Sequence, residues 1–253
     1  MERPCIGYRR RQSRETQTVL FVHGGGHMAG DVDVYDFSAR RTAAATQMVV
    51  VSVDYRRSPE APYPAGLEDT YSVLHDLPTA TSGIPTTGRV HAVADSGGAA
   101  KLASIAQRVA AGTWESPIER QVLIYPSLDY TMSGATIKTY GSGYFLTAER
   151  VAWYLDNYFP EGTDRVAASP LHGPYSAHMP HTLVIPAEFD PLRSEAEEYV
   201  SRMKDAGASA ELLTAPGMIH AFAFFETLVP EDVARLYGVI GEFLTTGVAP
   251  TSW

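Results

Sequence analysis

The chain has 253 residues, of which 45% are hydrophobic and 19% are charged. These proportions exclude a disordered or fibrous protein, and the length suits one α/β domain that spans residues 1–253 and folds around a single core. With 29 acidic and 20 basic side chains, the net charge is −9. This charge disfavours nucleic acid and anionic membrane surfaces as partners.

The cysteine content and the start of the chain indicate where in the cell the protein is expected. One cysteine, Cys5, excludes an internal disulfide, and the sequence contains neither a secretory signal segment nor a long apolar span. We therefore predict a cytoplasmic protein without a stable membrane association. A basic cluster near the start is interpreted as a solvated face without a function. It consists of Arg9, Arg10, Arg11 and Arg14.

Six short apolar runs predict the strands of a mostly parallel sheet. Several are apolar at successive positions, as expected for strands buried on both faces. Helical patterns lie between them, one ending at Gly207 and one beginning after Pro230. This alternation predicts an α/β fold with helices flanking the sheet. The runs are Thr18–Val22, Met48–Val53, Val90–Ala94, Gln121–Tyr125, Leu183–Pro186 and Ala210–Leu213.

Three consecutive glycines, Gly24 to Gly26, end the first run directly after His23. Glycine loses more backbone freedom on folding than any other residue, so this position requires bare backbone. Main-chain N–H groups without a neighbouring Cβ suit the binding of an oxyanion. A phosphate-binding loop is the alternative, but no Gly-Lys-Ser/Thr ending or dinucleotide fingerprint follows. His23 and His27 are spaced as metal ligands only on a helix, which the glycines forbid, so we predict no metal.

A second small-residue stretch surrounds Ser96, directly after the third run. A serine at a sharp strand-to-helix turn projects its hydroxyl above the sheet, and its neighbours must be small. The alternative is an ordinary helix N-cap made by Asp95 or Ser96. The stretch alone does not separate these interpretations, but the glycine loop favours a nucleophilic serine.

A nucleophilic serine needs a base and an acid that orients it. Among eight histidines we favour His220, because it follows the last run and a Pro-Gly turn, where a loop reaches the carboxyl edge of the sheet. The acid should precede the histidine in the chain. Asp190, after another run, is favoured over Glu188, although Asp190 could instead cap the following helix.

The segment 129–181 separates two predicted core strands by some fifty residues and contains a predicted helix over 147–158. This is too long for a simple connection, so we predict a cap insertion over one edge of the sheet.

Taken together, five motifs resemble the hormone-sensitive-lipase-like (bacterial family IV) carboxylesterases of the α/β-hydrolase superfamily. Their order and separations match over about residues 18 to 246. The motifs are HGGG at 23–26, DYRRSPEAPYPAGLED at 54–69, ADSGG at 94–98, DPLRSEAEEY at 190–199 and HAF at 220–222.

The resemblance implies an α/β-hydrolase fold and a serine carboxylesterase that hydrolyses short-chain carboxylic esters through an acyl-enzyme, without cofactor or metal. It implies Ser96 as nucleophile, His220 as base and Asp190 as acid. The segment 142–159 resembles the family's cap, whose aromatic residues shape the pocket. An amidase, deacetylase or lactonase with the same triad, or a non-catalytic small-molecule receptor, remains an alternative. The implied oxyanion-hole donors are the backbone amides of Gly25, Gly26 and Gly97.

The sequence departs from the family pattern at two places. Ala94 stands where the first glycine of the serine motif is usual, and we expect its methyl group to be tolerated. Only about 17 residues precede the first predicted strand, where members of the family have a longer segment. We therefore expect a reduced cap, one surviving edge strand near residues 6–10, a wide pocket and a possible homodimer.

Overall fold

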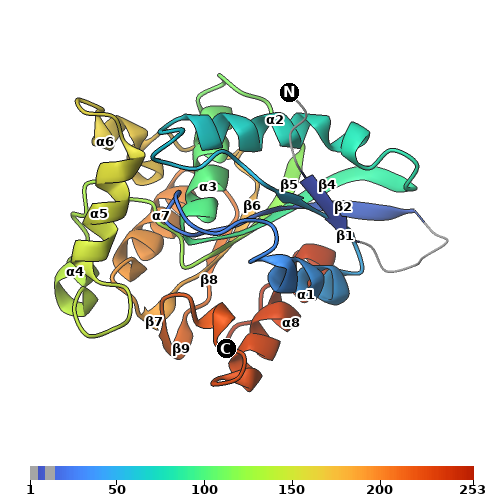
Figure 1. The fold of residues 1–253 in the computed structure, drawn as a ribbon. Helices are drawn as coiled ribbons and strands as arrows, with labels where there is room; N and C mark the ends of the chain where they lie inside the picture. Colours follow the sequence, from blue (N-terminus) through green and yellow to red (C-terminus); the bar gives the residue numbers. More distant parts are fainter. Residues whose placement is uncertain (1–4, 9–14) are drawn as a thin grey trace.

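The computed structural model describes residues 5–8 and 15–253, and within them a seven-stranded sheet has the order β1-β3-β2-β4-β5-β6-β8 (Figure 1). β1 is antiparallel to β3, and every other neighbouring pair is parallel. Each of the six predicted runs forms a strand, so the mostly parallel α/β fold is confirmed. The strands are β1 (Cys5–Tyr8), β2 (Thr16–Val22), β3 (Val49–Val53), β4 (Thr86–Asp95), β5 (Ile118–Ile124), β6 (His181–Ile185) and β8 (Ala210–Leu212).

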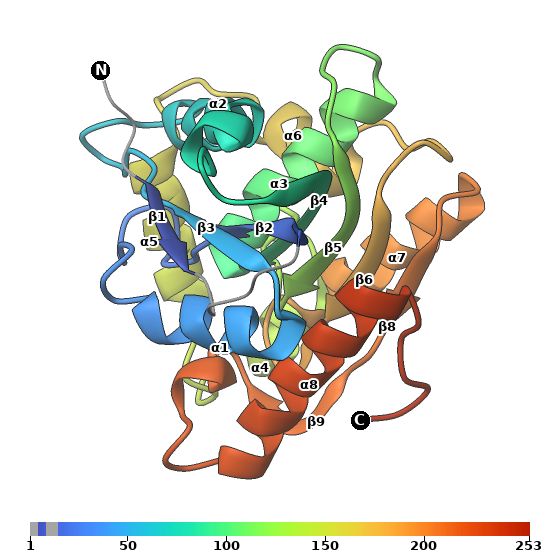
Figure 2. The same ribbon diagram turned by 90° about the vertical axis from the view of Figure 1, so that its right-hand side faces the viewer.

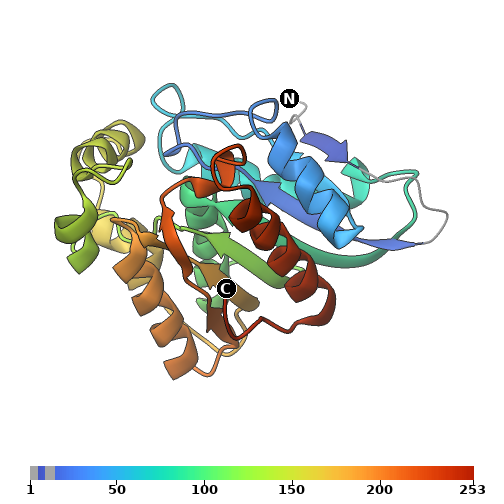
Figure 3. The same cartoon turned by 90° about the horizontal axis from the view of Figure 1, so that it is seen from below.

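Helices cover both faces of the sheet, which explains why the strands are apolar on both sides. In β2, Leu20 and Val22 pack in the layer of α2, α3 and α7, whereas Val19 and Phe21 pack in the layer of α1 and α8. Figures 2 and 3 show that α1 and α8 lie side by side on the face of the sheet that they cover. These helices are α1 (Asp36–Thr46), α2 (Ala65–Ala80), α3 (Ser96–Ala110), α7 (Arg193–Asp205) and α8 (Pro230–Thr246).

The end of α7 and the start of α8 follow the signals predicted from the sequence, and the end of α8 uses a glycine in the same way as the end of α7. Gly207 lies just beyond α7 with a φ of +79°, and Gly247 caps α8 with a φ of +78°. Both use the left-handed region that glycine enters without steric cost. Pro230 is the first residue of α8, where its missing N–H costs no hydrogen bond.

Two details differ from the predictions. The Pro-Gly pair at 216–217 is not a turn but part of β9 (Ala215–Ile219), which pairs in parallel with β7 (Ala187–Phe189) in a separate two-stranded sheet. Such short strands containing Pro and Gly have no alternating apolar pattern, so the sequence gives no strand signal there. β4 also begins four residues earlier than predicted.

The predicted edge strand near residues 6–10 is found as β1, at the antiparallel edge of the sheet. Residues 9 and 10 of the predicted strand lie outside the described residues, and so does the whole basic cluster. The cluster comprises Arg9, Arg10, Arg11 and Arg14.

The segment 129–181 carries four short helices grouped to one side of the sheet (Figure 1). The predicted helix over 147–158 is found as α5, where the Thr147 hydroxyl caps the first turn by accepting from the Arg150 N–H. Leu155 and Tyr158 of α5 belong to a buried cluster that includes Ala100 of α3 and so joins the segment to the sheet layers. The four helices are α4 (Ala135–Tyr140), α5 (Ala148–Tyr158), α6 (Arg165–Ala168) and the 3₁₀ helix η1 (Pro170–His172).

Candidate active site

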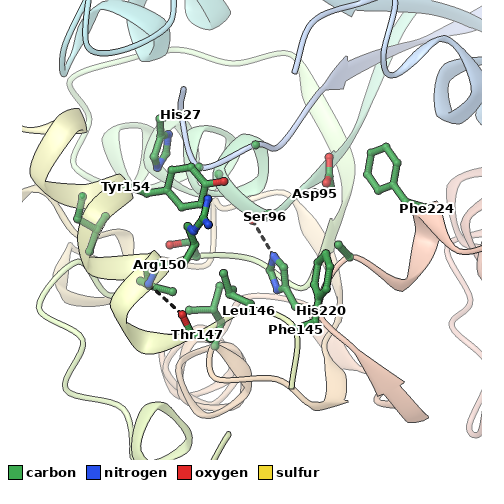
Figure 4. Close-up of a pocket in the computed structure, with 18 of the residues that line it drawn as sticks. His27, Asp95, Ser96, Phe145, Leu146, Thr147, Arg150, Tyr154, His220 and Phe224 are labelled. Atoms are coloured by element: carbon green, nitrogen blue, oxygen red, sulfur yellow. Dashed lines mark hydrogen bonds between the residues drawn. The ribbon is translucent and has the colours of Figure 1, made fainter. Parts of the chain in front are cut away.

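Three residues from distant parts of the chain meet at the carboxyl edge of the strands. Ser96 follows β4, Asp190 follows β7, and His220 follows β9. The Ser96 Oγ lies 3.0 Å from His220 Nε2 (Figure 4). On the other side of the ring, His220 Nδ1 lies 2.7 Å from Asp190 Oδ2. Because a carboxylate only accepts hydrogen bonds, Nδ1 carries the proton and the Nε2 lone pair faces the serine hydroxyl. This arrangement can take a proton from Ser96.

The turn at Ser96 explains its small neighbours. Ser96 has a φ of +47°, in the left-handed region that side chains rarely adopt, and it is the first residue of α3. A Cβ on Gly98 would overlap the carbonyl oxygens of Val22 and His23 at the end of β2. Ala94, by contrast, is fully buried in the apolar core, so the sheet accommodates its methyl group.

The Asp190 side chain lies beside His220, and the alternative that it caps the following helix is wrong, because α7 has no side-chain cap at its N-cap residue Leu192. Its side chain is buried; one oxygen contacts His220, and the other accepts the Leu192 N–H at 2.9 Å ahead of α7. Glu188 instead accepts the Gly217 N–H at 2.7 Å, across the β7–β9 pair. The structure therefore brings Asp190, and not Glu188, to the histidine.

The glycine loop has the bare backbone that its sequence predicted. Gly25 and Gly26 have φ values of +92° and +60°, and a Cβ on Gly26 would overlap the Tyr154 ring. A Cβ on Gly97 would lie 3.4 Å from the Gly26 nitrogen, so these two amides belong to neighbouring backbone segments. All three glycines line the same cavity as Ser96.

Asp95 holds this loop, a role that the sequence reasoning missed. Asp95 Oδ1 accepts the Gly24 N–H at 2.8 Å, and Oδ2 accepts the Tyr35 hydroxyl at 3.3 Å. Asp95 is the N-cap residue of α3, but its side chain makes no capping bond, so the ordinary N-cap alternative is wrong. Burial raises the pKa of Asp95 to about 6. The signal available in the sequence was a carboxylate directly before the serine, at the end of a buried strand.

His23 and Tyr55 brace the loop from behind. Their rings stack with centroids 4.3 Å apart, and the Tyr55 hydroxyl lies 2.8 Å from the His23 carbonyl oxygen and 2.9 Å from that of Gly24. Burial lowers the pKa of His23 to about 3, so its ring is neutral at pH 7. His27 points elsewhere, stacking on Tyr158 with centroids 3.7 Å apart.

A cavity of about 390 Å³ opens above Ser96 and His220 (Figure 4). This volume falls within the usual range for small-molecule sites. Arg150 lines it together with a mostly apolar wall, drawn largely from the predicted aromatic segment 142–159. The apolar and aromatic members of this wall are Tyr35, Phe145, Leu146, Val151, Tyr154, Leu155, Leu192, Ala221 and Phe224.

Comparison with known proteins extends these observations. Residues 19–224 match the family described as alpha/beta hydrolase fold. Over 225 residues the chain is 28% identical to an ethyl acetate hydrolase of Pseudomonas putida, covering 88% of this chain and 71% of that protein. A hyperthermophilic esterase from the archaeon Pyrobaculum calidifontis superimposes with a TM-score of 0.86 and 32% identity, over 96% of this chain and 82% of that chain.

A plant receptor is also similar. The gibberellin receptor GID1B of Arabidopsis thaliana is 31% identical over 209 residues, which cover 77% of this chain and 57% of that protein. The family match nonetheless spans most of the chain and includes the glycine loop and all three hydrogen-bonded residues, Ser96, Asp190 and His220. The chain belongs to the hormone-sensitive-lipase-like (family IV) carboxylesterases of the α/β-hydrolase superfamily.

Proposed function

We propose that this protein is a serine carboxylesterase that hydrolyses short-chain carboxylic esters through an acyl-enzyme intermediate. The observation that carries the proposal is the hydrogen-bonded chain from Ser96 through His220 to Asp190, beside a glycine loop that lines the same cavity. The esterase names of similar proteins support the same reaction class.

In the proposed mechanism, the Ser96 oxygen attacks the ester carbonyl while His220 Nε2 takes the hydroxyl proton. Asp190 stabilises the imidazolium that forms. Collapse of the tetrahedral intermediate breaks the bond to the alcohol, which leaves with the proton from Nε2. A water molecule then gives a proton to His220 and attacks the acyl-serine, and the acid is released with Ser96 restored. The proposed donors to the oxyanion are the backbone amides of Gly25, Gly26 and Gly97.

The preference for short acyl chains rests on the size of the cavity, about 390 Å³, and on the segment 129–181, which we propose acts as a cap over the site. Amides and lactones are acyl compounds that the same three residues could attack. The likeness to gibberellin receptors makes small-molecule binding without catalysis the second candidate.

Labelling with a fluorophosphonate separates an enzyme from a receptor. We expect mass spectrometry to find one adduct, on the peptide that contains Ser96, because the activated hydroxyl attacks phosphorus as it would attack an ester. Ser96→Ala is the control and should remain unlabelled while folding normally. An unlabelled wild-type chain would favour the receptor. A panel of ethyl esters, acetamides and lactones then assigns the acyl class.

Two expectations from the sequence concern the cellular location of the protein and its oligomeric state. Within the described residues, no helix is both long enough and apolar enough to cross a membrane. The cytoplasmic location and the homodimer expected from the sequence stay predictions.

A further inference from the structure

Arg150 lies on the face of α5 that meets the glycine loop. On this face Tyr154 covers Gly26, and Tyr158 stacks on His27. Residues four apart lie one helical turn from each other on the same face, so Arg150 continues this row by one turn. In Figure 4 its guanidinium points into the cavity beside Tyr154.

The guanidinium of Arg150 has no counter-charge in the part of the chain that the structure describes, where its side-chain contact is the Trp153 ring at 5.7 Å. Arg165 of α6, by comparison, forms an ion pair with Asp156 of α5 at 2.8 Å. The one carboxylate that lines the cavity, Asp95, is engaged with the glycine loop and Tyr35. Arg150 is solvent-exposed, and among the described residues that line the cavity it is the one cation that no carboxylate compensates.

Helix stability does not explain an arginine at this position. The Thr147 hydroxyl caps α5 by accepting the Arg150 N–H, which places Arg150 at the third helical position. A capping box has Glu or Gln there, and the dipole of the helix disfavours a cation in its first turn. Binding of a ligand in the cavity accounts both for an arginine at this position and for the direction of its side chain.

We propose that Arg150 binds a carboxylate carried by the substrate, so that the preferred substrates are esters with a negatively charged group several atoms from the scissile bond. This inference rests on the proposed esterase function. A planar guanidinium matches a carboxylate with two parallel hydrogen bonds, which adds direction to the charge attraction. In this arrangement the apolar wall of the cavity contacts the substrate carbons between the ester group and the carboxylate.

Monoethyl adipate and ethyl hexanoate form a matched pair of probes, because they differ only in a carboxylate that replaces a methyl group. We expect the wild type to have the higher kcat/KM for monoethyl adipate. Arg150→Gln should lower that kcat/KM about tenfold, the size of one charge-assisted contact, and change the value for ethyl hexanoate less than threefold. Arg150→Glu should reverse the preference.

Lys138→Gln is the control, since it removes an exposed cation of α4 that does not line the cavity. Equal losses on both esters in Arg150→Gln, or an unchanged preference, would overturn the assignment of Arg150. Failure of the wild type to hydrolyse either ester or to react with the fluorophosphonate would instead overturn the esterase function itself.

A second inference comes from Lys101, which is buried behind the glycine loop with 1% of its surface exposed. Its Nζ lies 2.9 Å from His27 Nδ1 and 3.4 Å from the Gly97 carbonyl oxygen. It also lies 3.8 Å from the centroid of the Tyr55 ring. No carboxylate within residues 15–253 forms an ion pair with it, and burial lowers the pKa of Lys101 to about 7.

A buried lysine without a carboxylate partner destabilises a fold, because the ammonium loses its hydration. The contacts of Lys101 join the two segments that carry the proposed oxyanion donors. His27 follows Gly26 in the glycine loop, and Gly97 follows Ser96 in α3. We infer that Lys101 is a positioning residue that holds these two backbone segments in register.

Lys101→Met tests this role, because methionine fills the same volume without the hydrogen bonds. We expect kcat for ethyl hexanoate to fall at least tenfold, while KM stays within threefold of the wild-type value. This pattern is typical of a lost contact to the transition state. The midpoint of thermal unfolding should equal or exceed that of the wild type. A purely structural lysine would instead give a lower midpoint with kcat unchanged, and that result would overturn the inference.

His27→Phe provides a second route, since phenylalanine retains the stacking on Tyr158 but offers no nitrogen to Lys101. If the two residues act as a pair, the loss of kcat in the double variant should equal that of the more impaired single variant. Fully additive losses would show that Lys101 does not act through His27.

Discussion

Replacing Asp190 with asparagine is expected to lower kcat about 10⁴-fold, the cost of losing the orienting carboxylate in a Ser-His-Asp triad. An asparagine amide can donate to His220 Nδ1, which stabilises the tautomer that carries its proton on Nε2. The Nε2 atom would then be unable to accept the proton of Ser96. The measurement is steady-state hydrolysis of ethyl hexanoate, with circular dichroism to verify that the fold is retained.

Glu188→Gln is the matched control for Asp190→Asn. Glu188 is two residues away and makes its hydrogen bond to the Gly217 N–H, which a glutamine carbonyl oxygen can still accept. We expect its kcat to stay within about threefold of the wild type. Equal losses in the two variants would contradict the assignment of the acid.

Replacing Gly98 with alanine is expected to destabilise the fold by more than about 3 kcal/mol, the range of severe overpacking. The new methyl group would overlap two backbone carbonyl oxygens at the end of β2, and neither α3 nor the sheet can move without breaking the turn at Ser96. Urea-induced unfolding followed by tryptophan fluorescence gives the free energy of unfolding.

Gly238→Ala is the control for Gly98→Ala, because it makes the same change in a helix. Gly238 lies in α8, and nothing within 4 Å would meet its Cβ. Alanine is the better helix former, so we expect the free energy of unfolding to rise by about 0.5–1 kcal/mol. A stable Gly98→Ala variant would show that the contact between α3 and β2 is looser than the structure indicates.

The strands and helix ends were predictable because their signals are local. Uninterrupted apolar runs such as Val49–Val53 have few alternatives to a buried strand, and Gly207 and Gly247 occupy a backbone region that favours glycine. β7 and β9 were not predictable. Each is stabilised by its pairing with the other, and Pro216 and Gly217 suggest a turn when considered alone.

The acid of the candidate site could not be identified from local sequence alone. Asp190 and Glu188 are both carboxylates near one strand end, and their spacing does not separate them. The pairing of β7 with β9 engages Glu188 with a backbone amide and leaves Asp190 beside the histidine. Asp95, Lys101 and Arg150 were missed for the same reason, because their roles depend on partners far away in the chain.

By itself, the sequence determined the α/β alternation, the two places where bare backbone is required, and the family to which the chain belongs. These follow from short-range patterns of burial and backbone freedom. Only the tertiary structure decided which side chains share one cavity, since Ser96 and His220 are 124 residues apart and follow strands that belong to two different sheets. It also decided that a cation faces that cavity without a partner in the described residues, because charge compensation depends on distance in space.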